Sequence, residues 1–278
     1  MIDILLSTYN GEKYLHQQLE SLINQTYTDW RLLIRDDGST DLTLDILKYY
    51  ISIYSDKIFL INDNKGNIGS TRSFSTLLEY SDSEYIMFCD QDDIWLPNKI
   101  ELTYAECHKM AENNTNKPVM VFTDLVLYGN ESQSVIGTSF IRYQNMDPLV
   151  VNNPWQCIAM SVAAGCTMMI NKLAKAFILP MPSELVHDHW IVCNIAFYGK
   201  CKYIDSPTIY YRIHNNNSIG INKVTKTYLL SKLLSFFKQV YYYKAMFNTL
   251  SFEVNKLHVL FYKIKFNIYR FLGIRLYK

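Results

Sequence analysis

The stretch Phe88-Cys89-Asp90-Gln91-Asp92-Asp93-Ile94-Trp95 places three carboxylates directly after a short apolar run. That run, residues 85–89, has the length and composition of a buried strand, and a helical pattern begins near Pro97. The carboxylates therefore gather at the carboxyl end of a strand, where open α/β sheets bind their ligands. They repel one another unless a cation lies among them, and a hard divalent ion that also binds a diphosphate would supply it. The alternative is a solvated acidic turn that caps the next helix.

The segments before this stretch alternate between strand and helix patterns. Strands are predicted at residues 2–8, 30–35 and 58–61, and helices at residues 12–25, 41–54 and 70–80. Ser39 or Thr40 is expected to cap the second of these helices. Strands and helices that alternate with short loops predict a parallel sheet with right-handed crossovers. The glycines follow neither the P-loop pattern nor the dinucleotide-binding pattern, which disfavours a dehydrogenase fold.

The second half of the chain continues the alternation less regularly. Residues 129–152 are polar and poorly periodic, and we expect them to form a surface excursion over the site. The last fifty residues show a helical period and are rich in Tyr, Phe and Lys. The remaining predictions are helices at residues 99–110, 172–177 and 187–197, strands at residues 119–127 and 162–170, and a strand or hairpin at residues 202–211.

Length and composition set broad limits on the protein. A chain of 278 residues that is 49% hydrophobic can bury one large core, or one core with a small appendage. The six cysteines form no C-x-x-C pair, so we expect small buried side chains in a reducing compartment rather than zinc ligands or disulfides. We expect neither a signal peptide nor a membrane-spanning helix, because no apolar window is long enough and free of charge.

Charge is divided unevenly along the chain. Residues 221–278 hold eleven Lys or Arg and one acidic residue, Glu253, whereas the formal net charge of the whole chain is +1. Basic residues that alternate with aromatic residues in a helix favour an anionic lipid interface, which is the interpretation we prefer for this tail. In the alternative, the aromatic side chains pack on the body or on a second subunit. No nucleic-acid-binding motif accompanies the basic residues, so no nucleic-acid partner is expected.

Over residues 2–220 the chain resembles the family 2 glycosyltransferases, which are inverting enzymes with the GT-A fold. The resemblance rests on short motifs that follow the predicted strands in the family's order: Ser7-Thr8-Tyr9-Asn10, Asp36-Asp37-Gly38-Ser39-Thr40-Asp41, Asn67-Ile68-Gly69 and Asp90-Gln91-Asp92-Asp93. In the same pattern Gly165 opens an acceptor-side strand, and His187-Asp188-His189-Trp190 precedes the last core helix. Each motif is modest, but their order and context make the set specific.

The variants D-Q-D-D-I-W, H-D-x-W and Y-R-x-H most resemble bacterial rhamnosyltransferase-like members that build surface polysaccharides. The Q-x-x-R-W signature of the processive synthases is absent, so transfer of one sugar per binding event is expected. The resemblance implies an α/β GT-A fold, which is Rossmann-like, with a mostly parallel central sheet flanked by helices. It divides the chain into a nucleotide-binding half at about residues 1–95, an acceptor half at about 96–220, and a helical tail at 221–278.

The resemblance also implies which residues bind the donor nucleotide. Asp37 would accept a hydrogen bond from the base, and Thr8 and Tyr9 would form the other wall. Asp36 and Asp41 better suit turn residues that satisfy backbone N–H groups. The other implied nucleotide contacts are Asn67, Gly69, Arg72 and Asp90, although Arg72 suits a helix-surface residue equally well.

The metal site implied by the resemblance consists of Asp92, as the direct ligand of Mn²⁺ or Mg²⁺, and His214. A lone histidine in a polar loop is more often solvated, and that alternative stays open for His214. Arg212 is a candidate phosphate contact on the same terms. Asp90 would lie toward both the ribose and the metal.

The acceptor side is implied to hold the catalytic base, Asp188, because inverting transfer needs one carboxylate to take the proton of the acceptor hydroxyl. Glu184 is the next carboxylate to consider. Asp93 would face the acceptor or cap the next helix. The other residues implied to contact acceptor or sugar are Trp95, Gly165 and Trp190, and plain core packing is the alternative for Trp190.

The expected function is transfer of one sugar from dTDP-rhamnose or a UDP-hexose to a hydroxyl of a growing, lipid-linked surface glycan. We expect the protein to be cytoplasmic and peripheral on the inner face of the cell membrane. The alternative is a scaffold protein that has lost its chemistry and holds a membrane polysaccharide assembly complex together. The joint presence of Asp90, Asp92 and Asp188 favours the enzyme, because a binding protein needs no base.

Overall fold

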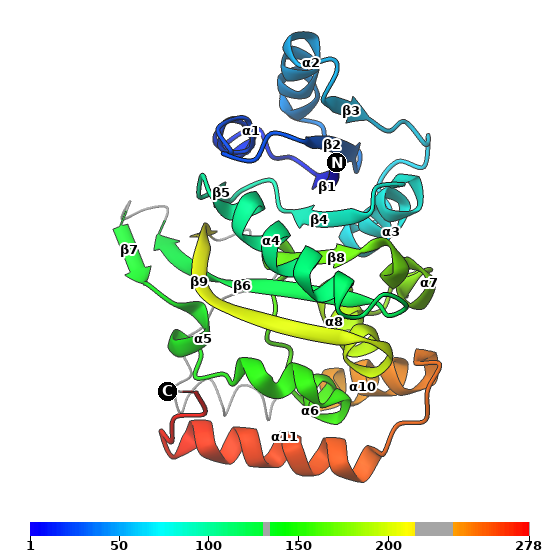
Figure 1. Ribbon diagram of the computed structural model, residues 1–278, viewed down its shortest axis with the longest axis vertical. Helices are drawn as coiled ribbons and strands as arrows, with labels where there is room; N and C mark the ends of the chain where they lie inside the picture. The colour runs from blue at the N-terminus through cyan, green and yellow to red at the C-terminus, as the bar shows by residue number, and fades with distance from the viewer. Residues whose placement is uncertain (130–133, 215–235, 278) are drawn as a thin grey trace.

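The computed structural model describes residues 1–129, 134–214 and 236–277. Its strands are β1 (Ile2–Thr8), β2 (Trp30–Asp36), β3 (Ile58–Leu60), β4 (Tyr85–Cys89), β5 (Ile94–Trp95), β6 (Val119–Gly129), β7 (Ser134–Gly137), β8 (Met168–Asn171) and β9 (Lys200–Ile213). Within the described ranges they form one sheet in the order β3-β2-β1-β4-β8-β6-β9-β5, with β7 paired to β6 (Figure 1).

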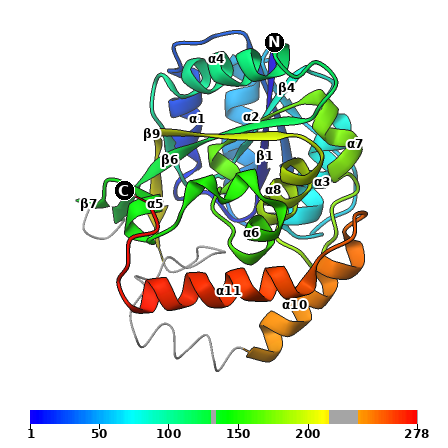
Figure 2. The same cartoon turned by 60° about the horizontal axis from the view of Figure 1, so that its bottom comes forward.

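The helices of the body cover both faces of this sheet (Figure 2). They are α1 (Leu15–Ile23), α2 (Thr43–Ile53), α3 (Ser70–Tyr80), α4 (Lys99–Glu112), α5 (Phe140–Tyr143), α6 (Pro154–Ala159), α7 (Lys175–Ile178) and α8 (His187–Tyr198), with short 3-10 turns at Pro148–Asn152, Gly165–Thr167 and Lys172–Ala174. Two further helices, α10 (Phe236–Thr249) and α11 (Lys256–Phe271), lie at the end of the molecule opposite α2 (Figure 1).

The first half of the chain folds as its periodicity predicts. Strands β1 to β4 are continuous apolar runs that pair in parallel, and α1 and α3 bury apolar faces against them. Because these strands are parallel, their carboxyl ends share one edge, and the motifs that follow β1, β2 and β4 meet there. The cap predicted for α2 is wrong: the Asp41 carboxylate accepts from the Thr43 amide at 3.0 Å, and Ser39 instead accepts from Asn10.

The second half departs from the prediction in three places. Strand β8 is antiparallel to both β4 and β6 and covers only Met168–Asn171, because residues 165–167 form a 3-10 turn. The segment 129–152 is not a surface excursion throughout, since Ile141 and Val150 are buried in the core. The two-residue strand β5 was not predicted, because its pairing with β9 joins residues more than one hundred positions apart.

The described part of the tail packs on the body. Met246 of α10 and Val259 and Phe266 of α11 belong to the buried core. Phe252 stacks on Phe197 of α8 with ring centroids 3.8 Å apart. The packing alternative is therefore correct for the inner faces of α10 and α11. Residues 221–235 of the expected basic tail, and its boundary near residue 220, lie outside the described residues.

None of the helices in residues 1–129, 134–214 and 236–277 is both long enough and apolar enough to cross a bilayer. The cysteines are free thiols, and all except the half-buried Cys201 are buried. This agrees with their expected role as small apolar side chains.

Candidate active site

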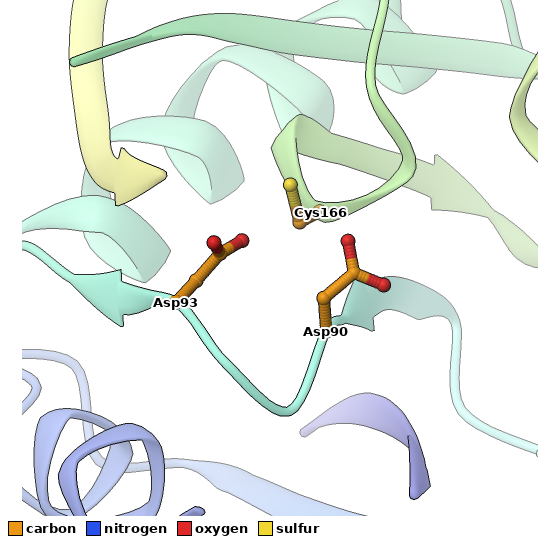
Figure 3. A group of neighbouring side chains, drawn as sticks. All are labelled: Asp90, Asp93 and Cys166. Carbon is orange, nitrogen blue, oxygen red and sulfur yellow. The ribbon is translucent and has the colours of Figure 1, made fainter. Parts of the chain in front are cut away.

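The acidic turn between β4 and β5 gathers its carboxylates around a thiol (Figure 3). Asp90 follows the end of β4, Asp93 precedes β5, and Cys166 comes from the 3-10 turn at residues 165–167. One ligand atom of each lies within 4.8 Å of the other two. The side chains point toward one another across the turn, as Figure 3 shows. The sequence did not indicate Cys166, because no spacing rule links it to residue 90.

The electrostatics of this turn are those of a buried anionic cluster. Burial, Asp92 and Asp188 together raise the pKa of Asp90 to about 7. Burial raises the pKa of Asp93 as well, and Asp92 and Asp90 raise it further. Lys99 lies fully buried beneath the turn, with its ammonium 4.5 Å from the centre of the Trp95 ring, and burial lowers its pKa to about 8. The negative charge of the three carboxylates in this turn therefore exceeds the positive charge of Lys99.

Asp92 points to a different partner. One of its oxygens lies 2.7 Å from Nε2 of His214, so the predicted metal pair is in contact. Arg212 fixes the backbone of the turn: its Nε donates to the Asp92 carbonyl at 2.9 Å, and its amide donates to Asp93 at 3.3 Å. The guanidinium also lies 4.7 Å from the centre of the Tyr14 ring. Arg212 therefore acts as a clamp on the acidic turn.

The side chains of the acidic turn have the chemistry of a divalent-cation site. Oδ2 of Asp93 is buried and has no hydrogen-bond partner among the described residues, which leaves an oxygen for another ligand. Burial and the neighbouring carboxylates raise the pKa values of Asp90 and Asp93, so a bound cation would stabilise their ionised forms. Burial also raises the pKa of the Cys166 thiol, so this sulfur stays protonated and is a poor ligand. Carboxylate oxygens with one imidazole suit Mn²⁺ or Mg²⁺.

Asp37 organises the loop that follows β3. Its carboxylate accepts from the amides of Ile68 and Gly69 at 2.8 and 2.9 Å, and from the buried guanidinium of Arg35 at 2.6 Å. Arg35 also pairs with Asp63 at 2.9 Å. Both Asp37 oxygens therefore already have protein donors. No role was predicted for Arg35 from the sequence, although it is 1% exposed despite its charge.

Thr8 and Tyr9 border the same edge of the sheet. The Thr8 hydroxyl donates to Asp36 at 2.9 Å, and Asp36 also accepts from the amide of Ser39, as expected of a turn residue. Tyr9 is half exposed, and its backbone exchanges two 2.9 Å hydrogen bonds with the side chain of Gln91. Gln91 thus joins the loop after β1 to the acidic turn.

The remaining predicted donor contacts lie on the loop before α3. Asn67 and Gly69 are exposed, and Gly69 has φ of +83°, a left-handed conformation that disfavours other residues. Arg72 is exposed on α3 and donates to the Ser183 hydroxyl at 3.1 Å. This contact reaches the segment before α8, so Arg72 joins the two halves of the chain.

Asp188 lies in the first turn of α8 and is 8% exposed. Burial raises its pKa to about 6. Its carboxylate accepts a hydrogen bond from the backbone of Gly165, and the next residue, Cys166, lies in the cluster with Asp90 and Asp93. The neighbouring His187 ring fills the space above Gly165, where an added Cβ would lie 2.5 Å from its Nε2. Gly165 is therefore required for the close approach of α8. It was predicted to open a strand, but it lies in the 3-10 turn before β8.

A cavity of about 200 Å³ opens beside Asp188. Its wall is mostly apolar and includes Leu125, Phe140 and Ala163. Tyr211 also lines it, and burial, Asp93 and Asp90 raise the pKa of Tyr211. A largely apolar pocket with a single carboxylate at one side is typical of a small-molecule site.

The tail contributes a residue to this cavity. Tyr242 of α10 lines it together with His189, and its hydroxyl lies 2.8 Å from Nδ1 of that histidine. Nε2 of His189 lies 3.0 Å from the Cys157 carbonyl, so Nε2 carries the proton and Nδ1 accepts from Tyr242. The sequence gave no signal for Tyr242, because it belongs to a run of three tyrosines in a segment expected to lie apart.

The two tryptophans predicted to contact sugar are buried. Trp95 is 2% exposed beneath the acidic turn. Trp190 is 5% exposed, and its indole N–H donates to the Ile178 carbonyl at 2.8 Å, which agrees with the packing alternative. Both side chains pack in the core beside β5 and α8, and their contact with sugar stays a prediction. Glu184 is exposed on the segment before α8.

Taken together, the curled mixed sheet and the acidic turn at its carboxyl edge define a GT-A glycosyltransferase. Two solved structures share the fold. The Staphylococcus aureus TarS 1–349 complex with UDP aligns at TM-score 0.55 and 18% identity, over 76% of this chain and 60% of that chain. The mannosyltransferase PcManGT from Pyrobaculum calidifontis, solved with GDP-Man and Mn²⁺, aligns at TM-score 0.57 and 14% identity, over 78% and 58%. This chain therefore spans about three fifths of either one.

The family profile described as Glycosyl transferase family 2 matches residues 3–174. The dTDP-rhamnosyl transferase RfbG of Shigella flexneri is 30% identical over 229 residues, which cover 78% of this chain and 74% of RfbG. The Escherichia coli enzyme WfgD, a UDP-Glc:alpha-D-GlcNAc-diphosphoundecaprenol beta-1,3-glucosyltransferase, is 29% identical over 231 residues, or 80% and 81% of the two chains. The chain belongs to glycosyl transferase family 2, and the predicted resemblance is confirmed.

Proposed function

We propose that this protein transfers one sugar from a nucleoside-diphosphate donor to a hydroxyl of a glycan, with inversion at the anomeric carbon and with Asp188 as the general base. The observation that carries the proposal is the position of Asp188. Its buried carboxylate accepts a hydrogen bond from the backbone of Gly165, next to Cys166 of the acidic cluster, and it lines a cavity of about 200 Å³. A single carboxylate between a nucleotide site and an acceptor cavity is what a one-step displacement needs.

In the reaction the acceptor hydroxyl gives its proton to Asp188 as its oxygen bonds to the anomeric carbon. The bond from that carbon to the diphosphate oxygen breaks, and its electron pair leaves with the diphosphate. A base must be ionised yet strong enough to accept the proton, which favours a pKa near the working pH. Burial raises the pKa of Asp188 to about 6, so it is mostly ionised at neutral pH and is a stronger base than an exposed carboxylate.

The acidic turn would hold the divalent cation. Asp92 and His214 are the proposed ligands. Asp90 and Asp93 belong to the same turn, where they lie together beside Cys166. When bound, Mn²⁺ or Mg²⁺ stabilises the charge that gathers on the departing diphosphate. The protein's contribution is to keep the turn in one conformation through Arg212 and Gln91.

We propose dTDP-rhamnose or a UDP-hexose as the donor, and a growing, lipid-linked surface glycan as the acceptor. The support is the activity of the two relatives, one a dTDP-rhamnosyl transferase and the other acting on a diphosphoundecaprenol-linked sugar. A lipid-linked acceptor would place the enzyme in the cytoplasm, peripheral on the inner face of the membrane. The base would lie near Asp37, Thr8 and Tyr9, and the diphosphate near Arg72 and Asp90.

The first experiment is a thermal-shift screen of UDP, dTDP, GDP and CMP, each with and without Mn²⁺. We expect UDP or dTDP to raise the melting temperature only when Mn²⁺ is present, because a ligand that binds the folded state stabilises it. Release of that nucleotide from its sugar donor is then measured for the unchanged chain and for Asp188→Asn. Binding in both proteins with turnover only in the unchanged chain supports the enzyme. Binding without turnover of any tested donor in either protein favours the scaffold, and no shift with any nucleotide contradicts the proposal.

A further inference from the structure

Helix α11 has two apolar faces on opposite sides. Its inner face packs on the body through Val259 and Phe266, which are 3% and 5% exposed. Its outer face is a stripe of large apolar side chains with exposed fractions from 47% to 78%: Leu257, Leu260, Phe261, Ile264, Ile268 and Phe271. These positions recur every three or four residues, which places them on one side of an α-helix. A helix that only covers a core needs one apolar face, so the outer face requires another explanation.

Basic residues border the outer face of α11. Lys256 and Arg275 are exposed at its two ends, and Lys265 is half-buried along the helix. Exposed Lys238 and Lys244 follow the same pattern on α10. The one acidic residue after position 220 is Glu253, in the turn before α11. An apolar stripe bordered by lysines is the pattern of a helix that lies in the plane of a lipid interface.

We propose that the outer face of α11 docks the protein on an anionic lipid bilayer, with its apolar side chains among the acyl chains and its basic residues at the lipid phosphates. This inference rests on the proposed function, since it names the surface by which the enzyme meets a lipid-linked acceptor. A second copy of the chain fits the face less well. Two outer faces packed together would bring Lys256, Lys265 and Arg275 of each copy near the like charges of the other, whereas anionic headgroups complement them.

The position of α11 connects docking to the acceptor side of the site. On its inner side, the ammonium of Lys263 donates to the Ala159 carbonyl at 3.2 Å, just before the segment that lines the cavity. Helix α10, which precedes α11 and lies at the same end of the molecule (Figure 2), supplies Tyr242 to the cavity wall. Docking through α11 therefore brings the acceptor cavity, rather than the nucleotide-binding half around α2, toward the lipid.

The test uses the full chain and sedimentation with vesicles of phosphatidylcholine alone or mixed with phosphatidylglycerol. The variant Leu260→Ser, Phe261→Ser, Ile264→Ser removes the centre of the outer face. The matched control, Tyr49→Ser with Ile53→Ser, removes exposed apolar side chains from α2 at the other end of the molecule. A third variant, Lys256→Gln with Lys265→Gln and Arg275→Gln, removes charge and leaves the apolar stripe.

We expect the unchanged chain and the α2 control to bind the mixed vesicles, and the triple serine variant to lose at least about tenfold in partition. The charge variant should bind less, and added salt should weaken binding of the unchanged chain. Absence of vesicle binding by the unchanged chain, or full binding by the triple serine variant, overturns the proposal. A dimer in light scattering that becomes a monomer in the triple serine variant, without vesicle binding, assigns the face to a second copy instead.

The nucleotide-induced thermal shift of each variant separates this inference from the proposed function. These substitutions lie on an exposed face, so the shift with nucleotide and Mn²⁺ should equal that of the unchanged chain. Loss of vesicle binding with an intact shift is the expected result. If the unchanged chain and all variants show the nucleotide-induced thermal shift but none binds vesicles, the docking surface is rejected and the proposed function is not. If none of these proteins shows the thermal shift, the proposed function is rejected, and vesicle binding still tests the docking surface.

Discussion

The two sides of the candidate site are built by different means. On the nucleotide side, polar side chains at the strand ends hold one another directly, as Arg35, Asp37 and Asp63 do. On the acceptor side, the carboxylate of Asp188 is buried beside a mostly apolar cavity, and Nε2 of the neighbouring His187 has no hydrogen-bond partner among the described residues. The first side has its geometry fixed by hydrogen bonds and ion pairs. On the second side, burial beside a cavity with mostly apolar walls raises the pKa of the base, Asp188.

This difference suggests what each side binds. A charged, hydrogen-bonding ligand such as a nucleoside diphosphate needs preorganised polar groups, whose geometry the ion pairs maintain. An acceptor hydroxyl needs one base of suitable strength, and a low-polarity setting provides it. The following predictions test whether substitutions on the two sides fail in these different ways.

On the nucleotide side, the largest effect is expected at the metal ligand. Asp92→Asn keeps the shape of the side chain but removes its charge, so metal-dependent donor turnover should fall about a thousandfold with the fold intact. Asp56→Asn, an exposed acid outside the site, is the control. Near-native turnover by Asp92→Asn in the presence of a chelator would reject the metal assignment.

The next effect concerns stability on the nucleotide side. Arg35→Met leaves the buried Asp37 without its cation and removes one of the two cations that pair with the half-buried Asp63, so the free energy of unfolding should fall by about 3–5 kcal/mol. Urea unfolding measures it. Lys48→Met, which breaks the exposed pair with Asp45, should cost less than about 1 kcal/mol. Equal losses in the two variants would mean that the buried pairs do not support the loop after β3.

The smallest effect is expected on the acceptor side. Tyr242→Phe removes the hydroxyl that donates to His189 and keeps the ring, so the free energy of unfolding should fall by about 1–2 kcal/mol. The nucleotide-induced thermal shift should stay unchanged, because Tyr242 lines only the acceptor cavity. Tyr241→Phe, at an exposed neighbouring position, should change neither quantity. A lost nucleotide shift in Tyr242→Phe would show that the two sides are not separate.

The sequence predicted the nucleotide side far better than the acceptor side, for a physical reason. Each motif there follows a strand with a clear apolar pattern, and parallel strands bring their carboxyl ends together. Contacts such as Asp92 with His214 were accessible only through the family resemblance. Cys166 and Tyr242 reach the site through antiparallel pairing and tail packing, which join residues distant in the chain and leave no periodic signal. The burial of Trp95 was also not predicted, because an aromatic residue beside an acidic motif gives no sign of its burial.

The most direct test of this account is the pH dependence of donor turnover in the unchanged chain and in Asp188→Asn, with saturating Mn²⁺. Burial raises the pKa of Asp188, so its ionised fraction, and with it turnover, should rise as the pH increases through about 6 and then level off. Asp188→Asn should be lower by about 10²–10⁴ and lack this rise, while it binds the nucleotide normally. A variant that keeps full turnover, or that keeps the same rise near pH 6, would show that the base is another carboxylate.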